Sequence, residues 1–176
     1  EIGLHGGKNH ATWQKSAHSW SASRVLEEIE WSKSVLAEIC GQPPRSFSSP
    51  GWNRSPVNDK VLLELDFDYA ADLHGSINDS IIESANGSVR QVNTCLSGEP
   101  GGVGYLEWLT ASHKSYDEII MLLGRALRSG RELVVMYDHP CFAGIQKLSL
   151  LKEIIELVRQ HEYEIITMYD AVMGSG

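Results

Sequence analysis

Short apolar segments alternate with segments of helical periodicity along most of this 176-residue chain. Residues 24–40 carry apolar side chains at helical spacing, whereas residues 132–137 (ELVVMY) form a continuous apolar run typical of a buried strand. This alternation predicts βαβ units and a mainly parallel sheet, either open or closed into a barrel. In both arrangements functional side chains gather at the carboxyl ends of the strands.

The same reading gives one expected element for most parts of the chain. Helices are expected over residues 24–40, 58–65, 116–128 and 148–160. Strands are expected at residues 1–5, in a short part of 45–56 that ends in a loop, and at 67–70, 89–96, 132–137 and 163–168. Loops are expected over residues 6–23 and 97–105. We interpret residues 1–176 as a single domain, since this length allows one sizeable core.

Composition excludes several classes of function. The formal net charge of −8 disfavours nucleic acid as a partner, because phosphates repel an acidic surface. No apolar run approaches the roughly 20 residues of a membrane span. The three cysteines, Cys40, Cys95 and Cys141, are widely spaced and odd in number, so we interpret them as reduced packing residues.

Two histidines, His5 and His10, lie at the end of the first expected strand and in the loop after it. A hydrolytic metal site uses a few His and carboxylate ligands and keeps one position open for water. Gly6 and Gly7 would let such a loop bring both imidazoles to one ion. The alternative is a pair of ordinary loop histidines with local hydrogen bonds.

A third histidine, His139, follows the segment ELVVMY directly after Asp138, and Pro140 turns the chain away. A histidine at the end of a strand is well placed to act as a general acid. The alternative is a histidine that caps the loop.

Two further groups of residues allow a functional and a structural interpretation. Tryptophans in loop segments could stack on a sugar or pack in the core: Trp13, Trp20 and Trp52. Carboxylates around the 67–70 strand could line one face of a site or be solvated near a turn: Asp66, Asp68 and Asp72.

Several of these segments, taken in order, resemble the NodB-type polysaccharide deacetylases. The first is most similar to the lipid A-related arabinose deformylases, through Gly3, Leu4, His5, His10, Trp13 and Gln14. The segments GQPPRSFSSPGW, FDYAADLHG and VVMYDHPCFAGIQKLSLLKEIIELVRQ are similar to the later motifs of the superfamily. The resemblance spans most of the chain, although each motif is short.

The resemblance implies a distorted (β/α) barrel and a divalent metal, commonly zinc. It implies a metal-dependent hydrolase that removes an N-acyl group, acetyl or formyl, from a sugar or polysaccharide. His5 and His10 then correspond to metal ligands, with one residue inserted so that Asn9 is not a ligand. His139 corresponds to the general acid, on the same mouth as His5. In the matched segments we assign substrate binding to Pro50, Gly51, Trp52 and Asp68.

This sequence departs from the family pattern at two points. The family's aspartate pair, which supplies the base and the third ligand, has no counterpart before His5, so we expect the first βα unit to be absent from this chain. The arginine before the Pro-Gly turn is replaced by Ser48 or Ser49. The alternative is therefore a non-catalytic carbohydrate-binding relative that has lost the metal site. An open barrel edge predicts association with a second copy or a partner chain.

Overall fold

The protein is described by a computed structural model that covers residues 1–75, 81–82, 89–99 and 103–174. Contacts within the chain divide it into two compact units. The first unit comprises Glu1–Leu73, Ile81–Asn93 and Met168–Gly176, and the second comprises His74–Ser80 and Thr94–Thr167.

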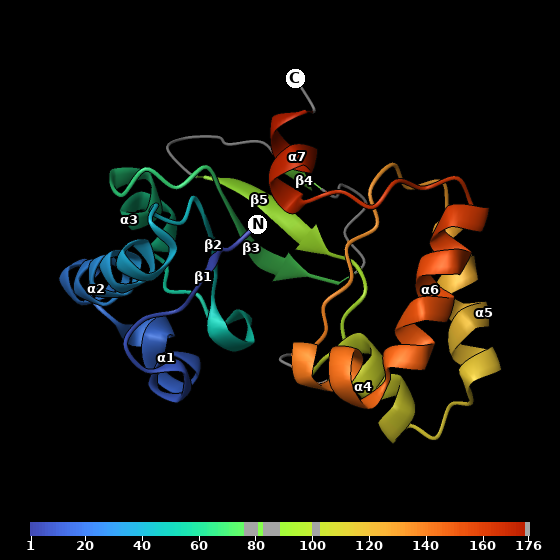
Figure 1. The fold of residues 1–176 in the computed structure, drawn as a ribbon. Coiled ribbons are helices and arrows are strands. Elements are labelled where there is room, and N and C mark those ends of the chain that lie inside the picture. Colours follow the sequence, from blue (N-terminus) through green and yellow to red (C-terminus); the bar gives the residue numbers. More distant parts are fainter. Residues whose placement is uncertain (76–80, 83–88, 100–102, 175–176) are drawn as a thin grey trace. The chain divides into compact units, whose positions relative to one another are not determined.

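The first unit contains the sheet. Its strands are β1 (Leu4–His5), β2 (Ser46–Ser48), β3 (Tyr69–His74), β4 (Ile81–Ile82) and β5 (Arg90–Thr94). They lie in the order β1-β2-β3-β5-β4. Parallel pairing aligns Leu4 with Phe47 and Phe47 with Ala70, and β3 and β5 run in the same direction (Figure 1). Among the described strands only β4 is antiparallel to its neighbour, and these strands form an open sheet, so the predicted α/β class and mainly parallel sheet are confirmed.

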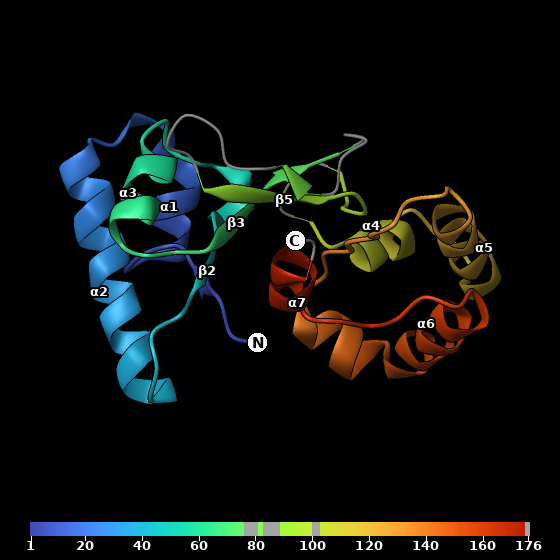
Figure 2. The same cartoon turned by 90° about the horizontal axis from the view of Figure 1, so that it is seen from above.

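Three helices cover one side of strands β1 to β3 (Figures 1 and 2). They are α1 (His10–Ser16), α2 (Ala22–Cys40) and α3 (Asn58–Glu64). The long helix α2 begins where the Ser21 hydroxyl accepts a hydrogen bond from Arg24 N, and it ends at Gly41 in the left-handed conformation. Val25 and Ile29 on its inner face join the core around Phe47 and Trp13. The last helix, α7 (Met168–Met173), lies beside β5, where Val172 O accepts a hydrogen bond from Arg90.

The second unit is mainly helical. It contains α4 (Tyr105–Ala111), α5 (Tyr116–Leu127) and α6 (Leu148–Gln160), with a π-helical turn over Phe142–Gln146. A capping box between Ser115 and Glu118 begins α5. Figure 2 shows α5 and α6 side by side, and their apolar faces form a second core that includes Ile119, Leu123 and Ile154. No helix in the described part of the chain is long and apolar enough to cross a membrane.

Several sequence-based expectations are wrong in detail. Residues 163–167 form no strand, and Met168 begins α7 instead. Residues 132–137 form only a parallel bridge between Met136 and Leu96. A strand needs a neighbouring strand for its backbone hydrogen bonds, so β propensity alone does not make a segment a strand. The expected loop over residues 6–23 contains α1, and residues 100–102 of the expected loop 97–105 lie outside the described residues.

The cysteines follow their prediction only in part. All three are free, and Cys40 and Cys95 are partly buried. Cys141 is exposed, so the packing interpretation is wrong for that residue. It lies at the start of the turn before α6 rather than on a helix face that meets the core.

Candidate functional site

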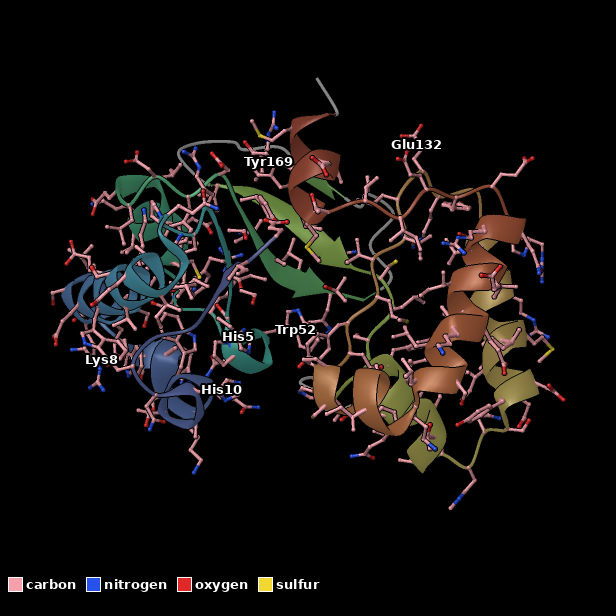
Figure 3. The ribbon with its side chains drawn as sticks, in the orientation of Figure 1. His5, Lys8, His10, Trp52, Glu132 and Tyr169 are labelled. Atoms are coloured by element: carbon pink, nitrogen blue, oxygen red, sulfur yellow. The ribbon has the colours of Figure 1, made fainter. Side chains whose placement is uncertain are left out.

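His5 and His10 converge in the first unit. His5 ends β1 and His10 is the first residue of α1, and the two Nε2 atoms lie 3.2 Å apart (Figure 3). The ring centroids are 5.0 Å apart with the planes tilted by 52°, so the nitrogens approach each other without stacking of the rings. Both side chains are exposed.

The other ring nitrogen of His5 is held by the neighbouring strand. His5 Nδ1 lies 2.8 Å from Ser48 Oγ and 3.1 Å from Ser48 O. A carbonyl oxygen can only accept, so we assign the His5 proton to Nδ1 and a lone pair to Nε2. The parallel register that pairs His5 with Ser48 brings these groups together. Such an outer hydrogen bond is the usual way in which a metal-binding histidine is oriented.

The loop between the two histidines has a local explanation. Asn9 is the N-cap of α1, and its Oδ1 accepts a hydrogen bond of 2.9 Å from Thr12 N. Gly6 has a φ of 79°, and an added Cβ would lie 2.6 Å from the ring of Pro50. The cap and the glycine thus let the loop turn so that His10, and not Asn9, faces His5.

Three of the residues assigned to substrate binding follow β2 directly. Pro50, Gly51 and Trp52 form a 3-10 turn, η2, that lies against α1 (Figure 3). Gly51 and Trp52 both have positive φ values, and a Cβ at Gly51 would lie 2.7 Å from the amide of Gln14. The structure therefore brings this turn next to the helix that carries His10.

Asp68 lies elsewhere in the first unit. It precedes β3, and both its carboxylate oxygens accept hydrogen bonds from Arg45, the one from Nε being 2.6 Å long. Because the strands are parallel and Asp68 stands before β3, it lies at the end of the sheet opposite to His5 and Ser48. The structure does not bring Asp68 together with the two histidines, and its assignment to substrate binding stays a prediction.

Asp72 is a buried carboxylate beside this site. It is 3% exposed, and its Oδ1 accepts a hydrogen bond of 2.6 Å from Ser49 N. Ser49 Oγ accepts another of 3.0 Å from Asn58, whereas Asp72 Oδ2 has no hydrogen-bond partner among the described residues. Burial raises the pKa of Asp72, and the hydrogen bonds from Ser49 oppose this effect. The interpretation of a solvated carboxylate is therefore wrong for Asp72.

The tryptophans divide between the two interpretations. Trp13 and Trp20 pack edge to face, with ring centroids 5.3 Å apart; Trp13 is buried in the core of the first unit, and the partly buried Trp20 packs against that core. Trp13 Nε1 also donates a hydrogen bond of 3.1 Å to Asn53 O. Trp52 is half-buried on η2. The core interpretation thus holds for two of the three rings.

His139 stands in a separate cluster in the second unit. Its Nδ1 lies 2.6 Å from Glu107 Oε2, and its Nε2 lies 2.8 Å from the Tyr137 hydroxyl. The side chain is 40% exposed. Glu107 comes from α4, and its Oε2 also accepts a hydrogen bond of 3.1 Å from Gly104 N. The carboxylate can only accept, so we assign a proton to His139 Nδ1.

Asp138 fixes the position of this segment. Its carboxylate accepts hydrogen bonds of 2.6 Å from Leu106 N and 2.9 Å from His139 N. A Cβ at Gly104 would lie 2.5 Å from Asp138 Oδ1, so a glycine is needed where the carboxylate meets α4. Burial raises the pKa of Asp138, and these two backbone hydrogen bonds oppose that effect.

The two clusters include residues that sequence reasoning did not identify. Tyr137 is two residues before His139, and this spacing on an extended segment places both on one face, which the sequence could have indicated. Glu107 is distant in the sequence from His139 and carried no local signal, and Ser48 was noted only at the position of the family's arginine and not as a partner of His5. Within the described residues, no group of three or more His, Cys, Asp or Glu side chains converges as a metal site.

Comparison with known proteins finds solved structures with a similar fold. No family model matches the chain. The chain is similar to a solved structure named "putative polysaccharide deacetylase from Mycobacterium smegmatis", with a TM-score of 0.72 and 20% identity. That match covers 99% of this chain and 62% of the other. A second, named "probable polysaccharide deacetylase from Pseudomonas aeruginosa PAO1", has a TM-score of 0.72 and 14% identity, over 98% of this chain and 58% of that one.

These matches identify the class of fold. The chain has the α/β fold of the polysaccharide deacetylases, and it spans less than two thirds of the length of either protein. The α/β fold of this class, which the sequence resemblance implied, is therefore confirmed, whereas the described strands form an open sheet and no closed barrel.

Proposed function

We propose that this chain carries the histidine ligands and the proton donor of a metal-dependent hydrolase that removes an N-acyl group from a sugar. The observation that carries the proposal is the approach of His5 Nε2 and His10 Nε2 to 3.2 Å. Zinc holds histidine nitrogens at about 2.0–2.1 Å in tetrahedral geometry, so two such ligands lie about 3.3–3.4 Å apart. The spacing of the two imidazoles thus fits one ion.

The two histidines supply two of the three protein ligands that a catalytic zinc site uses. His5 Nδ1 bonds to Ser48, which leaves Nε2 available as a ligand, and His10 becomes a second ligand when its proton sits on Nδ1. A divalent ion bound here supplies Lewis-acid chemistry at an amide carbonyl. The fold of the polysaccharide deacetylases supports a carbohydrate amide as the substrate.

His139 supplies the proton in this proposal. Glu107 holds the Nδ1 proton and thereby orients the ring, so that the second nitrogen, Nε2, gains and loses the transferable proton. The leaving group of amide hydrolysis is an amine, which needs a proton as the carbon–nitrogen bond breaks. The Pro50–Trp52 turn beside α1 is the proposed sugar-contacting segment.

Zinc titration tests the metal site. We expect the chain to bind zinc in isothermal titration calorimetry, and His5→Ala and His10→Ala each to abolish that binding. His113→Asn is the matched control, because His113 is exposed and has a left-handed φ of 59° that Asn tolerates. Equal zinc binding by the two alanine variants and the wild type would contradict the proposal.

Release of free amine from an N-acetylglucosamine oligomer tests the reaction. We expect the zinc-loaded chain to release amine and His139→Ala to slow this release by about 10²–10⁴-fold without loss of zinc. Binding of the oligomer without zinc binding or amine release would favour the carbohydrate-binding alternative.

A further inference from the structure

The Nε2 atom of His139, which would transfer the proton, contacts the Tyr137 hydroxyl in the structure. This nitrogen and the hydroxyl oxygen lie 2.8 Å apart, and the two rings meet edge to face with centroids 5.3 Å apart. A substrate amine cannot occupy the position that the hydroxyl already fills. Either Tyr137 moves away during the reaction, or the proton passes through it.

The hydrogen-bond directions favour passage through Tyr137. Glu107 accepts from His139 Nδ1–H, so the neutral ring presents a lone pair at Nε2, and the Tyr137 hydroxyl donates to it. When Nε2 is protonated, the direction reverses and N–H donates to the phenol oxygen. The three groups therefore form one continuous path from a carboxylate to a hydroxyl.

We propose that Tyr137 is the last group of a proton relay, through which His139 protonates the leaving amine. This inference rests on the proposed function, because it concerns how the proton reaches the amine. It assigns to Tyr137 a role separate from ring packing.

The step balances without any further reactant. As the carbon–nitrogen bond breaks, the amine nitrogen takes the Tyr137 hydroxyl proton, and the phenol oxygen takes the proton of His139 Nε2. Tyr137 thus ends neutral, His139 ends neutral with its proton on Nδ1, and Glu107 remains a carboxylate. Burial, with the nearby charges of Glu107 and Asp138, raises the pKa of Tyr137. A free phenolate is therefore disfavoured, which suits a group that gains one proton as it gives another.

Removal of the hydroxyl tests the relay. We expect Tyr137→Phe to lower amine release from the N-acetylglucosamine oligomer by about the same 10²–10⁴ as His139→Ala, with unchanged KM and zinc binding. The double variant should show no further loss, because members of one relay are not additive. Tyr116→Phe is the control, since the Tyr116 ring lies under Lys147 and outside the His139 cluster.

Two kinetic results would overturn the relay. If Tyr137→Phe is as fast as the wild type while His139→Ala is slow, His139 donates directly and the proposed function stands without the relay. If Tyr137→Phe is faster, the hydroxyl blocks the acid instead of serving it.

A spectroscopic measurement tests the hydrogen bond that the relay needs, and it does not depend on amine release. If the wild-type chain releases no amine, the proposed function itself fails and the relay with it. Nitrogen NMR of the His139 ring should show Nδ1 protonated and Nε2 hydrogen-bonded in the neutral wild type. Tyr137→Phe should shift the Nε2 resonance and leave Nδ1 in place. An unchanged Nε2 resonance would show that the hydroxyl does not reach this nitrogen, and the relay would be overturned.

Discussion

His5 in the first unit and His139 in the second are anchored in the same way and differ in what their second nitrogen meets. Each ring presents Nδ1 to an oxygen acceptor, Ser48 in one case and Glu107 in the other. Beyond the ring, His5 Nε2 faces another imidazole at 3.2 Å, whereas His139 Nε2 faces a hydroxyl at 2.8 Å.

This difference decides what each ring can do. Two imidazole nitrogens that face each other can bind one cation through their lone pairs. A nitrogen that binds the cation in this way carries no proton to donate to a substrate. A nitrogen that faces a hydroxyl can pass a proton along a hydrogen bond. In these two clusters, what each histidine can do therefore follows from the group opposite Nε2 once Nδ1 is fixed.

The largest expected effect concerns the carboxylate that anchors His139. Glu107→Gln keeps the shape of the side chain but can present an amide N–H to Nδ1, which would reverse the ring's proton assignment. We expect amine release to fall by about 10²–10⁴-fold while zinc affinity stays unchanged. Steady-state rates and zinc titration check this, with Glu156→Gln as the control on the exposed face of α6. An equal loss of amine release in Glu156→Gln would show that the effect of Glu107→Gln does not come from its hydrogen bond to His139.

The matching change in the first unit should act on metal affinity instead. Ser48→Ala removes the hydroxyl that His5 Nδ1 contacts at 2.8 Å but keeps the Ser48 carbonyl. Loss of one outer hydrogen bond typically lowers metal affinity by about 10–100-fold. Because the Ser48 carbonyl still accepts from His5 Nδ1, we expect a loss of zinc affinity at the lower end of this range, about 10-fold. Ser46→Ala is the control, since Ser46 contacts Glu1 at the other end of β2. Unchanged zinc affinity in Ser48→Ala would show that the carbonyl alone orients His5.

Sequence patterns predicted the elements whose stability is local. The helix over residues 148–160 was predicted with the bounds that α6 has, and α2 begins two residues before its predicted start. Both carry regular apolar faces. The short helix α1 was missed, because Trp13 is the one buried residue in a sequence that is otherwise polar. Residues 163–168 were expected as a strand, but a strand also needs a partner, which local patterns do not reveal.

The candidate sites divide in the same way. The approach of His5 to His10 depends on a turn of a few residues, which the glycines and spacing indicated. His5 and Ser48 are 43 residues apart in the sequence, and their contact depends on the register in which β1 pairs with β2. Glu107 meets His139 across 32 residues through the packing of α4. Long-range contacts of this kind arise from tertiary packing, so the sequence of one chain does not reveal them.

A smaller effect is expected from the buried carboxylate beside the first site, and it depends on pH. Burial raises the folded-state pKa of Asp72 above its ordinary value. The folded protein then holds this proton when the unfolded chain has already lost it, so stability falls as pH rises between the two pKa values. Asp72→Asn cannot ionise and keeps an oxygen for Ser49 N. We therefore expect the free energy of unfolding of Asp72→Asn, relative to that of the wild type, to be larger at pH 7 than at pH 3, so that the variant is relatively more stable at pH 7.

Urea unfolding at both pH values measures this change. Asp59→Asn is the control, because Asp59 is a carboxylate of the same unit that forms an ion pair of 2.7 Å with Arg54. A difference between Asp72→Asn and the wild type that does not vary with pH would mean that Asp72 carries the same number of protons in both states.

The smallest effect is expected at Asp68, which shares the first unit with His5 but lies at the opposite end of the sheet. Its partner Arg45 has a side chain that is 58% exposed, and such surface ion pairs contribute about 0–1 kcal/mol. Asp68→Asn should therefore lower the free energy of unfolding by less than about 1 kcal/mol. Because the parallel strands separate Asp68 from the end of the sheet that carries His5, zinc affinity should not change.

Binding of the N-acetylglucosamine oligomer discriminates between the two roles considered for Asp68, a structural ion pair with Arg45 and a substrate contact. Unchanged binding supports a purely structural ion pair, whereas weaker binding with intact stability would support the substrate contact predicted from sequence and extend the sugar-binding surface beyond the Pro50–Trp52 turn.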